Sequence, residues 1–122
     1  MASILEISNL AKSYTSGSKT LKVLDDINFS ITEKETFSIV GPSGSGKSTL
    51  LYILGTLEQP SSGHIAVDGI DPFTLDDREL AVFRNTKVGF VFQDHLLLPQ
   101  CTVLENVLVP TLVSDSDASV VD

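Results

Sequence analysis

The 122-residue chain contains a single cysteine and no tryptophan, and no lysine or arginine follows Lys87. One cysteine excludes an internal disulfide framework and fits a reducing compartment. No base accompanies Cys101 in the local sequence, so we expect it to be a small buried hydrophobic residue rather than a nucleophile. Basic residues are also scarce, 8 against 16 acidic ones, which argues against binding nucleic acid through clustered Lys and Arg.

Long apolar runs and a leader pattern are absent as well. No run approaches the roughly 18 apolar residues that cross a bilayer, and Glu6 interrupts the N-terminus where a signal peptide would need an apolar stretch. Apolar residues make up 42% of the chain, an ordinary value for a globular protein. We therefore expect a cytoplasmic chain that forms one domain or part of a larger one, with any attachment to a membrane made through a partner.

Hydrophobic periodicity predicts a chain of the α/β class. Apolar segments bounded by turn residues predict strands at residues 4–10, 21–31, 36–40, 64–69 and 88–92. The last of these is apolar on both faces, which is typical of a buried parallel strand. Helical spacing and capping residues predict helices from residue 47 to the turn at 59–63, over 76–85 and over 102–109. Residues 114–122 are polar and acidic, and we interpret them as a tail.

One motif carries the chemistry. Between a predicted strand and a predicted helix, the chain satisfies the phosphate-binding pattern G-x-x-x-x-G-K-[ST] with Gly41, Pro42, Ser43, Gly44, Ser45, Gly46, Lys47 and Ser48. The glycines let the backbone turn tightly and point its N–H groups inward, and the helix N-terminus adds partial positive charge. Lys47 would reach the β- and γ-phosphates of a nucleotide, the Ser48 hydroxyl would ligate Mg²⁺, and Thr49 would contact the phosphates.

A phosphate-binding loop predicts a nucleoside triphosphate but not what happens to it. Kinases, GTPases, motor proteins and transporter ATPases share the loop, so the reaction has to be argued from the surrounding sequence. The plainer alternative is a flexible Gly/Ser-rich loop that happens to precede a helix. The complete motif in its strand–loop–helix context favours the phosphate site over that alternative.

Further segments match a known family. Tyr14 lies 27 residues before Gly41, the apolar segment 89–92 ends in Gln93, and residues 97–107 contain Leu-Leu-Pro followed by Thr-Val-Leu-Glu-Asn-Val. Together with the loop, these segments resemble the ATP-binding domain of ABC transporters over residues 3–113. Connecting segments are most similar to the branch that releases lipoproteins or exports macrolides; they lie at residues 60–63, 67–69 and 83–85.

The resemblance implies a P-loop NTPase fold with an N-terminal antiparallel β subdomain and part of a RecA-like core. It implies that Tyr14 stacks on the adenine of ATP, and that Gln93 reaches Mg²⁺ and the attacking water at the joint with a helical subdomain. The implied partners are a transmembrane permease subunit and a second ATP-binding domain, which forms a homodimer in the family. The implied location is peripheral, on the cytoplasmic face of the membrane. Residues 1–113 would form the partial ATP-binding domain and 114–122 the acidic tail.

The sequence also departs from the family pattern. Lys34 stands where a glycine usually precedes Glu35, and a left-handed backbone there would cost about 1 kcal/mol. The Leu-Ser-Gly-Gly-Gln-type signature and the strand ending in Asp-Glu do not occur, and His64 and His95 come too early to be the family's switch histidine. We therefore expect weak binding of ATP and Mg²⁺ without competent hydrolysis, and no complete catalytic set, as for an N-terminal piece of a transporter ATPase.

An incomplete sheet would leave apolar side chains without cover. We expect Phe37, Ile39 and Phe90 to face solvent or an unpaired sheet edge. Two other functions stay open: a different P-loop enzyme such as a small-molecule kinase, and a non-catalytic module that docks on a membrane subunit through residues 93–109. The position of Tyr14 and the absence of an Asp-bearing second strand argue against the kinase.

Overall fold

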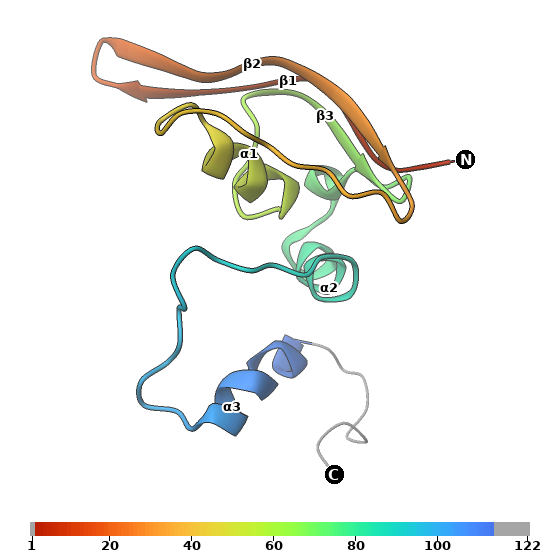
Figure 1. Cartoon of the computed structure of the whole chain (residues 1–122), viewed down its shortest axis with the longest axis vertical. Helices are drawn as coiled ribbons and strands as arrows, with labels where there is room; N and C mark the ends of the chain where they lie inside the picture. The colour runs from red at the N-terminus through yellow and green to blue at the C-terminus, as the bar shows by residue number, and fades with distance from the viewer. Residues whose placement is uncertain (1, 114–122) are drawn as a thin grey trace. The chain divides into compact units, whose positions relative to one another are not determined.

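The computed structural model describes residues 2–113. The chain divides after Asp76 into two compact units. The first unit contains a β-sheet and the second is helical (Figure 1). Within the described residues, no helix combines the length and the apolar character needed to cross a membrane.

The first unit is built on a three-stranded antiparallel sheet with the order β2-β1-β3 (Figure 1). Its strands are β1 (Ser3–Ser16), β2 (Lys19–Thr32) and β3 (Ser62–Val67). The three strands predicted here are confirmed, but β1 is longer than predicted. Gly17, with φ of 61°, closes a tight turn, so the ladder of β1 with β2 continues to the pair Ser16–Lys19.

Helix α1 (Lys47–Leu54) packs against this sheet (Figure 1). The core consists of buried apolar side chains from the strands and the helix: Ile7, Leu10, Leu24, Leu50, Ile53 and Ile65. Leu50 and Ile53 are one helical turn apart, so they face the sheet together. The helix ends earlier than predicted, because Thr56 has a left-handed backbone (φ 66°) and the N–H of Leu57 turns back to Tyr52 O at 2.8 Å, the hydrogen bond that closes a helix C-terminus.

Two predicted strands are wrong. Residues 36–40 and 88–92 have no strand conformation, and neither segment joins a sheet within the part of the chain that the structure describes. A strand persists only where a neighbour completes its backbone hydrogen bonds, and among residues 2–113 the sheet contains only β1, β2 and β3. The unpaired segments are open to solvent: Val40 is 88% exposed and Val91 is 96% exposed.

The apolar side chains of these two segments are covered in part. Phe37 is 46% exposed and stacks on Phe29 of β2, with ring centroids 4.6 Å apart, so its predicted exposure is confirmed. Ile39 packs against the core, which corrects the expectation for that residue. Phe90 is half-buried and lies against Phe92, with ring centroids 4.3 Å apart.

The second unit follows a 3-10 turn, η1 (Pro72–Thr74), and contains α2 (Asp77–Lys87), α3 (Val103–Leu108) and a 3-10 helix, η2 (Val109–Val113). The predicted cap of α3 is confirmed, since Thr102 Oγ1 accepts a hydrogen bond from Glu105 N–H at 3.1 Å. The helical conformation does not end before Pro110. It continues as the tighter 3-10 helix η2, because proline offers no N–H for another α-helical hydrogen bond. The predicted tail, residues 114–122, lies outside the described residues.

Candidate functional site

The predicted phosphate-binding loop lies in the first unit, where residues 41–46 lead into α1. Gly44 (φ 80°) and Gly46 (φ 95°) have left-handed backbones that glycine adopts without strain. A Cβ atom on Gly46 would lie 3.0 Å from the Val23 carbonyl oxygen and 3.0 Å from Leu24 Cδ2. The close approach of β2 to the start of α1 therefore requires a glycine at position 46.

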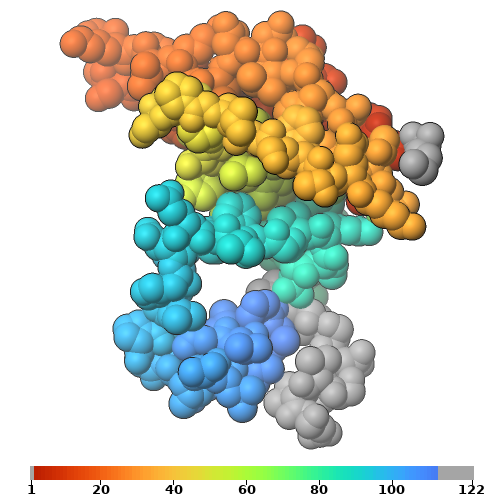
Figure 2. Space-filling view, viewed as in Figure 1, coloured from red at the N-terminus to blue at the C-terminus, as the bar shows by residue number. Residues whose placement is uncertain are grey.

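The side chain of Lys47 folds back over the loop. Its ammonium group donates hydrogen bonds to the carbonyl oxygens of Gly41 and Pro42, the second at 2.8 Å. The N–H of Ser45 donates to the same Pro42 oxygen at 3.2 Å, which tightens the loop beneath the ammonium. Residues 41–45 are exposed, and the segment that contains them lies on the surface of the first unit (gold in Figure 2). An ammonium has three N–H donors, so one remains for an anion.

Helix α1 presents its N-terminus at the same place. Its N-cap, Gly46, provides no side-chain cap, and the first turn contains no acidic residue. The first bond inside the helix runs from Leu50 N–H to Gly46 O at 3.0 Å, so the N–H groups before Leu50 have no partner within the helix. Ser48 is exposed and Thr49 is half-buried. The positive end of the helix and the Lys47 ammonium together suit phosphate oxygens.

Tyr14 lies on β1 close to the hairpin turn, opposite Leu21 of β2, and it is 42% exposed. The Lys12 ammonium lies 5.0 Å from the centroid of its ring. The structure therefore places an accessible aromatic ring in the same unit as the loop.

The remaining candidate, Gln93, lies in the second unit, in the exposed segment between α2 and α3. Cys101 belongs to the same unit and is half-buried, not buried as expected from the sequence. It lines a cavity of about 340 Å³ that is largely apolar. The loop residues are thus assembled within one unit, whereas Gln93 belongs to the other.

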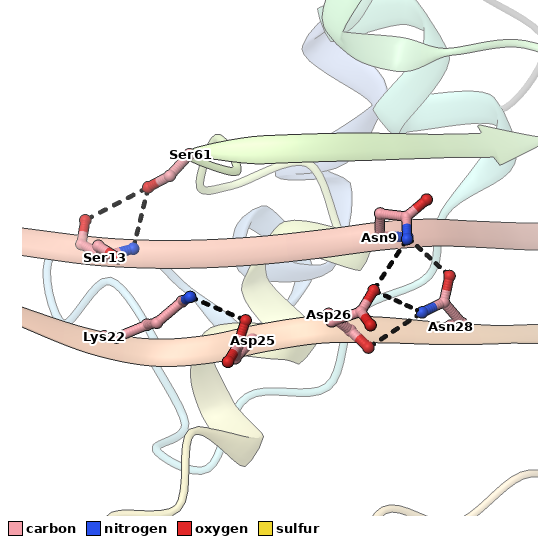
Figure 3. Close-up of polar contacts among 7 residues, drawn as sticks. All are labelled: Asn9, Ser13, Lys22, Asp25, Asp26, Asn28 and Ser61. Atoms are coloured by element: carbon pink, nitrogen blue, oxygen red, sulfur yellow. Dashed lines mark hydrogen bonds and ion pairs between the residues drawn. The ribbon is translucent and has the colours of Figure 1, made fainter.

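A polar cluster that joins β1 and β2 was missed by sequence reasoning (Figure 3). The Asp26 carboxylate accepts hydrogen bonds from Asn9 Nδ2 at 2.8 Å and from Asn28 Nδ2 at 2.9 Å. Asn28 Oδ1 in turn accepts the Asn9 backbone N–H at 2.8 Å. The side-chain amides of Asn9 and Asn28 lower the pKa of Asp26 below its ordinary value of 3.8. The available signal was the pair of asparagines inside apolar strands, where asparagine is uncommon.

This cluster lies where the hairpin changes register. Asn9 (φ 51°) and Asp26 (φ 49°) both have left-handed backbones, and the ladder of β1 with β2 shifts around each of them. Bulges of this kind bend a strand and re-aim the side chains beyond them. The cluster therefore fixes the bend between the base of the hairpin and the part that carries Tyr14, Val23 and Leu24.

Comparison with known proteins agrees with this geometry. A family model described as ABC transporter matches residues 24–122. The lipoprotein-releasing system ATP-binding protein LolD 1 of Rhodopirellula baltica is 51% identical over 116 residues, and LolD of Geobacter metallireducens is 52% identical over 114 residues. The alignments cover 95% and 93% of this chain, and 51% of each relative. The chain thus spans about half the length of the curated relatives it matches.

Solved structures give the same fold. The ATP-binding cassette MJ0796, in a dimeric post-hydrolysis state bound to ADP and Pi, matches with a TM-score of 0.87 and 42% identity over 94% of this chain and 50% of that one. A second dimeric structure of MJ0796, described as a bacterial ABC transporter cassette, matches with a TM-score of 0.87 and 43% identity over 93% of this chain and 49% of that one. From its motif, its fold and these matches, the chain belongs to the ABC transporter family, with the fold of the family's ATP-binding cassette.

Proposed function

We propose that the chain binds ATP with the triphosphate on residues 41–48. The observation that carries the proposal is the Lys47 ammonium, held by the carbonyl oxygens of Gly41 and Pro42 beside an uncapped helix end. A triphosphate would bring its negative charge to a place that offers a cation, free N–H donors and no carboxylate in the first turn of α1. The names of the relatives, which are ATP-binding proteins, support ATP as the nucleotide.

The residues present fit a Mg²⁺ ion that is held mainly by the nucleotide. Ser48 offers an exposed hydroxyl next to Lys47, and residues 2–113 contain no group of three His, Cys, Asp or Glu side chains that would hold a metal. Mg²⁺ commonly keeps several waters and shares substrate phosphates with few protein ligands. Ser48 would therefore hold the ion. Gln93 as a further oxygen ligand is proposed from the family resemblance alone, since it belongs to the second unit. When bound, the ion would neutralise charge on the β- and γ-phosphates.

Tyr14 would stack on the adenine. Its ring is accessible, and the strand that carries it is joined to the segment that follows α1. Ser13 N–H donates to Ser61 Oγ at 2.9 Å (Figure 3), and Ser61 N–H donates to Ala11 O at 2.9 Å. These bonds support a fixed placement of the ring relative to the helix that begins at the loop.

Binding without turnover is the second part of the proposal. Hydrolysis needs a residue that orients or activates the attacking water, in addition to phosphate positioning and Mg²⁺. The 122 residues supply the loop and Gln93, but they contain no Asp-Glu and no Ser-Gly-Gly sequence. We therefore expect the chain as it stands to hold ATP without competent hydrolysis.

For a complete protein, we propose that the site couples ATP to transport or lipoprotein release on the cytoplasmic face of a membrane. The description of the matching family as ABC transporter supports a transmembrane permease subunit as a partner, and the dimeric solved structures support a second ATP-binding domain. The apolar cavity of the second unit would serve as the docking surface for the membrane subunit. The same surface would serve if the chain were a non-catalytic docking module. The cavity is lined by Leu97, Leu98, Pro99, Cys101, Val103, Asn106 and Val107. Capture of a membrane protein should be lost when Leu97 and Leu98 are both replaced by Asp, and unchanged capture would contradict this surface.

Equilibrium dialysis against ATP and Mg²⁺ tests the binding site. Lys47→Ala should weaken binding at least about tenfold, because it removes a charge-assisted contact to phosphate oxygens. Lys34→Ala removes the same charge from the turn after β2 and should leave the affinity within about twofold, because it lies outside the loop. Equal affinities of the two variants would contradict the proposed site.

A further inference from the structure

We propose that Lys12 is a positioning residue for the nucleotide base, which acts by fixing the ring of Tyr14. The inference rests on the proposed function, since it concerns how Tyr14 is presented to adenine. It assigns a role in nucleotide binding to a lysine outside the phosphate-binding loop.

The Lys12 ammonium is anchored by the segment that follows α1. It donates a hydrogen bond to the carbonyl oxygen of Gln59 at 2.7 Å and forms an ion pair with Glu58 Oε1 at 2.8 Å. Only 13% of the Lys12 side chain is exposed, whereas 36% of the Glu58 side chain is exposed. A lysine held in this way has lost most of the freedom of its long side chain, so it can serve as a fixed contact for a neighbour.

That neighbour is the ring of Tyr14. The ammonium lies 5.0 Å from the ring centroid, within the range of about 6 Å over which a cation is attracted to the face of an aromatic ring. One face of the ring is therefore occupied by Lys12, while the tyrosine as a whole is 42% exposed. A planar base would take the opposite face, and the ring would not have to be ordered when the base binds.

The same stretch of β1 is joined to the segment after α1 at consecutive residues. Ser61 bonds the backbone of Ala11 and Ser13, and the side chain of Lys12 bonds Gln59 and Glu58 between them. Because this segment continues the helix that starts at the loop, the ring is positioned relative to the phosphate site. Lys12 should then affect ligands that carry a base and leave phosphate binding alone.

Two probes separate these contributions: ATP with Mg²⁺, and inorganic tripolyphosphate with Mg²⁺. Lys12→Met keeps the length of the side chain and removes the cation, and it should weaken ATP binding about fivefold with tripolyphosphate binding unchanged. Lys12→Arg should restore ATP binding to within about twofold, because Arg also contacts aromatic faces. The matched control is Lys22→Met, an exposed lysine of β2 paired with Asp25 at 2.8 Å, which should leave both affinities unchanged.

The outcomes distinguish this inference from the proposed function. If Tyr14→Ala leaves ATP binding unchanged, the proposal that Tyr14 stacks on adenine is wrong, and the role proposed for Lys12 is wrong as well. If Tyr14→Ala weakens ATP binding and Lys12→Met does not, stacking stands and the role of Lys12 is overturned. Equal weakening of ATP and tripolyphosphate by Lys12→Met would also overturn it, because Lys12 would then support the loop as a whole. Should Lys12→Met fail to fold, Glu58→Gln, which loosens the anchor, should weaken ATP binding alone, and no change would count against the inference.

Tyrosine fluorescence provides a readout without any nucleotide. The chain has two tyrosines and no tryptophan, so in a Tyr52→Phe background the emission comes from Tyr14 alone. Adding Lys12→Met should lower the fluorescence anisotropy of Tyr14, since the ring would lose the contact that restricts it. An unchanged anisotropy would contradict the positioning role.

Discussion

Lys34 occupies the turn after β2 with φ of 68°, in the left-handed region that side chains rarely adopt. The turn is held by Glu35, whose N–H donates to Thr32 O at 3.2 Å and whose carboxylate accepts the Thr32 N–H at 2.9 Å. These bonds keep the backbone angle although the residue at its centre is not glycine. The left-handed backbone on which the expected strain depended is thus confirmed.

Replacing this lysine should stabilise the chain. Lys34→Gly should raise the free energy of unfolding by about 1 kcal/mol, because glycine adopts the same angle without the steric cost of a Cβ atom. Lys34→Ala keeps the Cβ atom and should leave the free energy unchanged within about 0.5 kcal/mol. Urea unfolding of the two variants measures the difference, and equal stabilities would contradict strain at this position.

The residues of the phosphate-binding loop could be predicted one by one, because the motif that identifies them is a continuous stretch of sequence. The loop residues follow one another in the sequence, and Lys47 lies where the motif places it. The role proposed for Lys12 was not predictable, because it depends on Glu58 and Gln59, which only the fold brings to it. Motifs report short-range arrangements, whereas contacts between distant segments require the structure.

At the scale of elements, periodicity predicted β1, β2, β3 and the three α-helices but overstated two strands. The apolar pattern of segments 36–40 and 88–92 is typical of buried strands, and it contains no information about their neighbours. A pattern shows that a segment would be stable next to a neighbour; it does not show that the neighbour is there. Without a neighbouring strand, the side chains of Val40 and Val91 in these segments are exposed to solvent.

The hairpin also contains a pH-dependent contact between its strands. Asn9 and Asn28 bond the Asp26 carboxylate and hold its folded-state pKa below the ordinary value of 3.8. A carboxyl group with a lowered folded-state pKa contributes stability above its unfolded-state pKa, and that contribution is lost as the pH falls through the folded-state value.

The stability difference between the unsubstituted chain and Asp26→Asn should therefore shrink on acidification. Urea unfolding between about pH 6 and about pH 2 should show the unsubstituted chain more stable at the upper end and the two chains converging at the lower end. Asp25→Asn is the matched control, since it removes an equal charge from the adjacent residue, which lies outside the asparagine cluster (Figure 3). A difference for Asp26→Asn that stays constant over this range would contradict the effect.

For the whole molecule, the family could be predicted from the sequence because its motifs and their order are preserved over residues 3–113. The fold of the ATP-binding cassette is confirmed by the solved structures. The participation of Gln93 stays a prediction, because it lies in the second unit. Whether ATP at the proposed site would be hydrolysed depends on a residue that activates the attacking water, and the 122 residues contain no Asp-Glu sequence, to which the family resemblance assigns that role.

The most direct measurement is the chemical identity of the nucleotide that the 122-residue chain retains in dialysis against labelled ATP and Mg²⁺. We predict that label accumulates on the protein side and is recovered as ATP, that Lys34→Ala behaves in the same way, and that Lys47→Ala loses the accumulation. A chain that retains no label, or label recovered as ADP in a manner that depends on Lys47, would contradict binding without turnover.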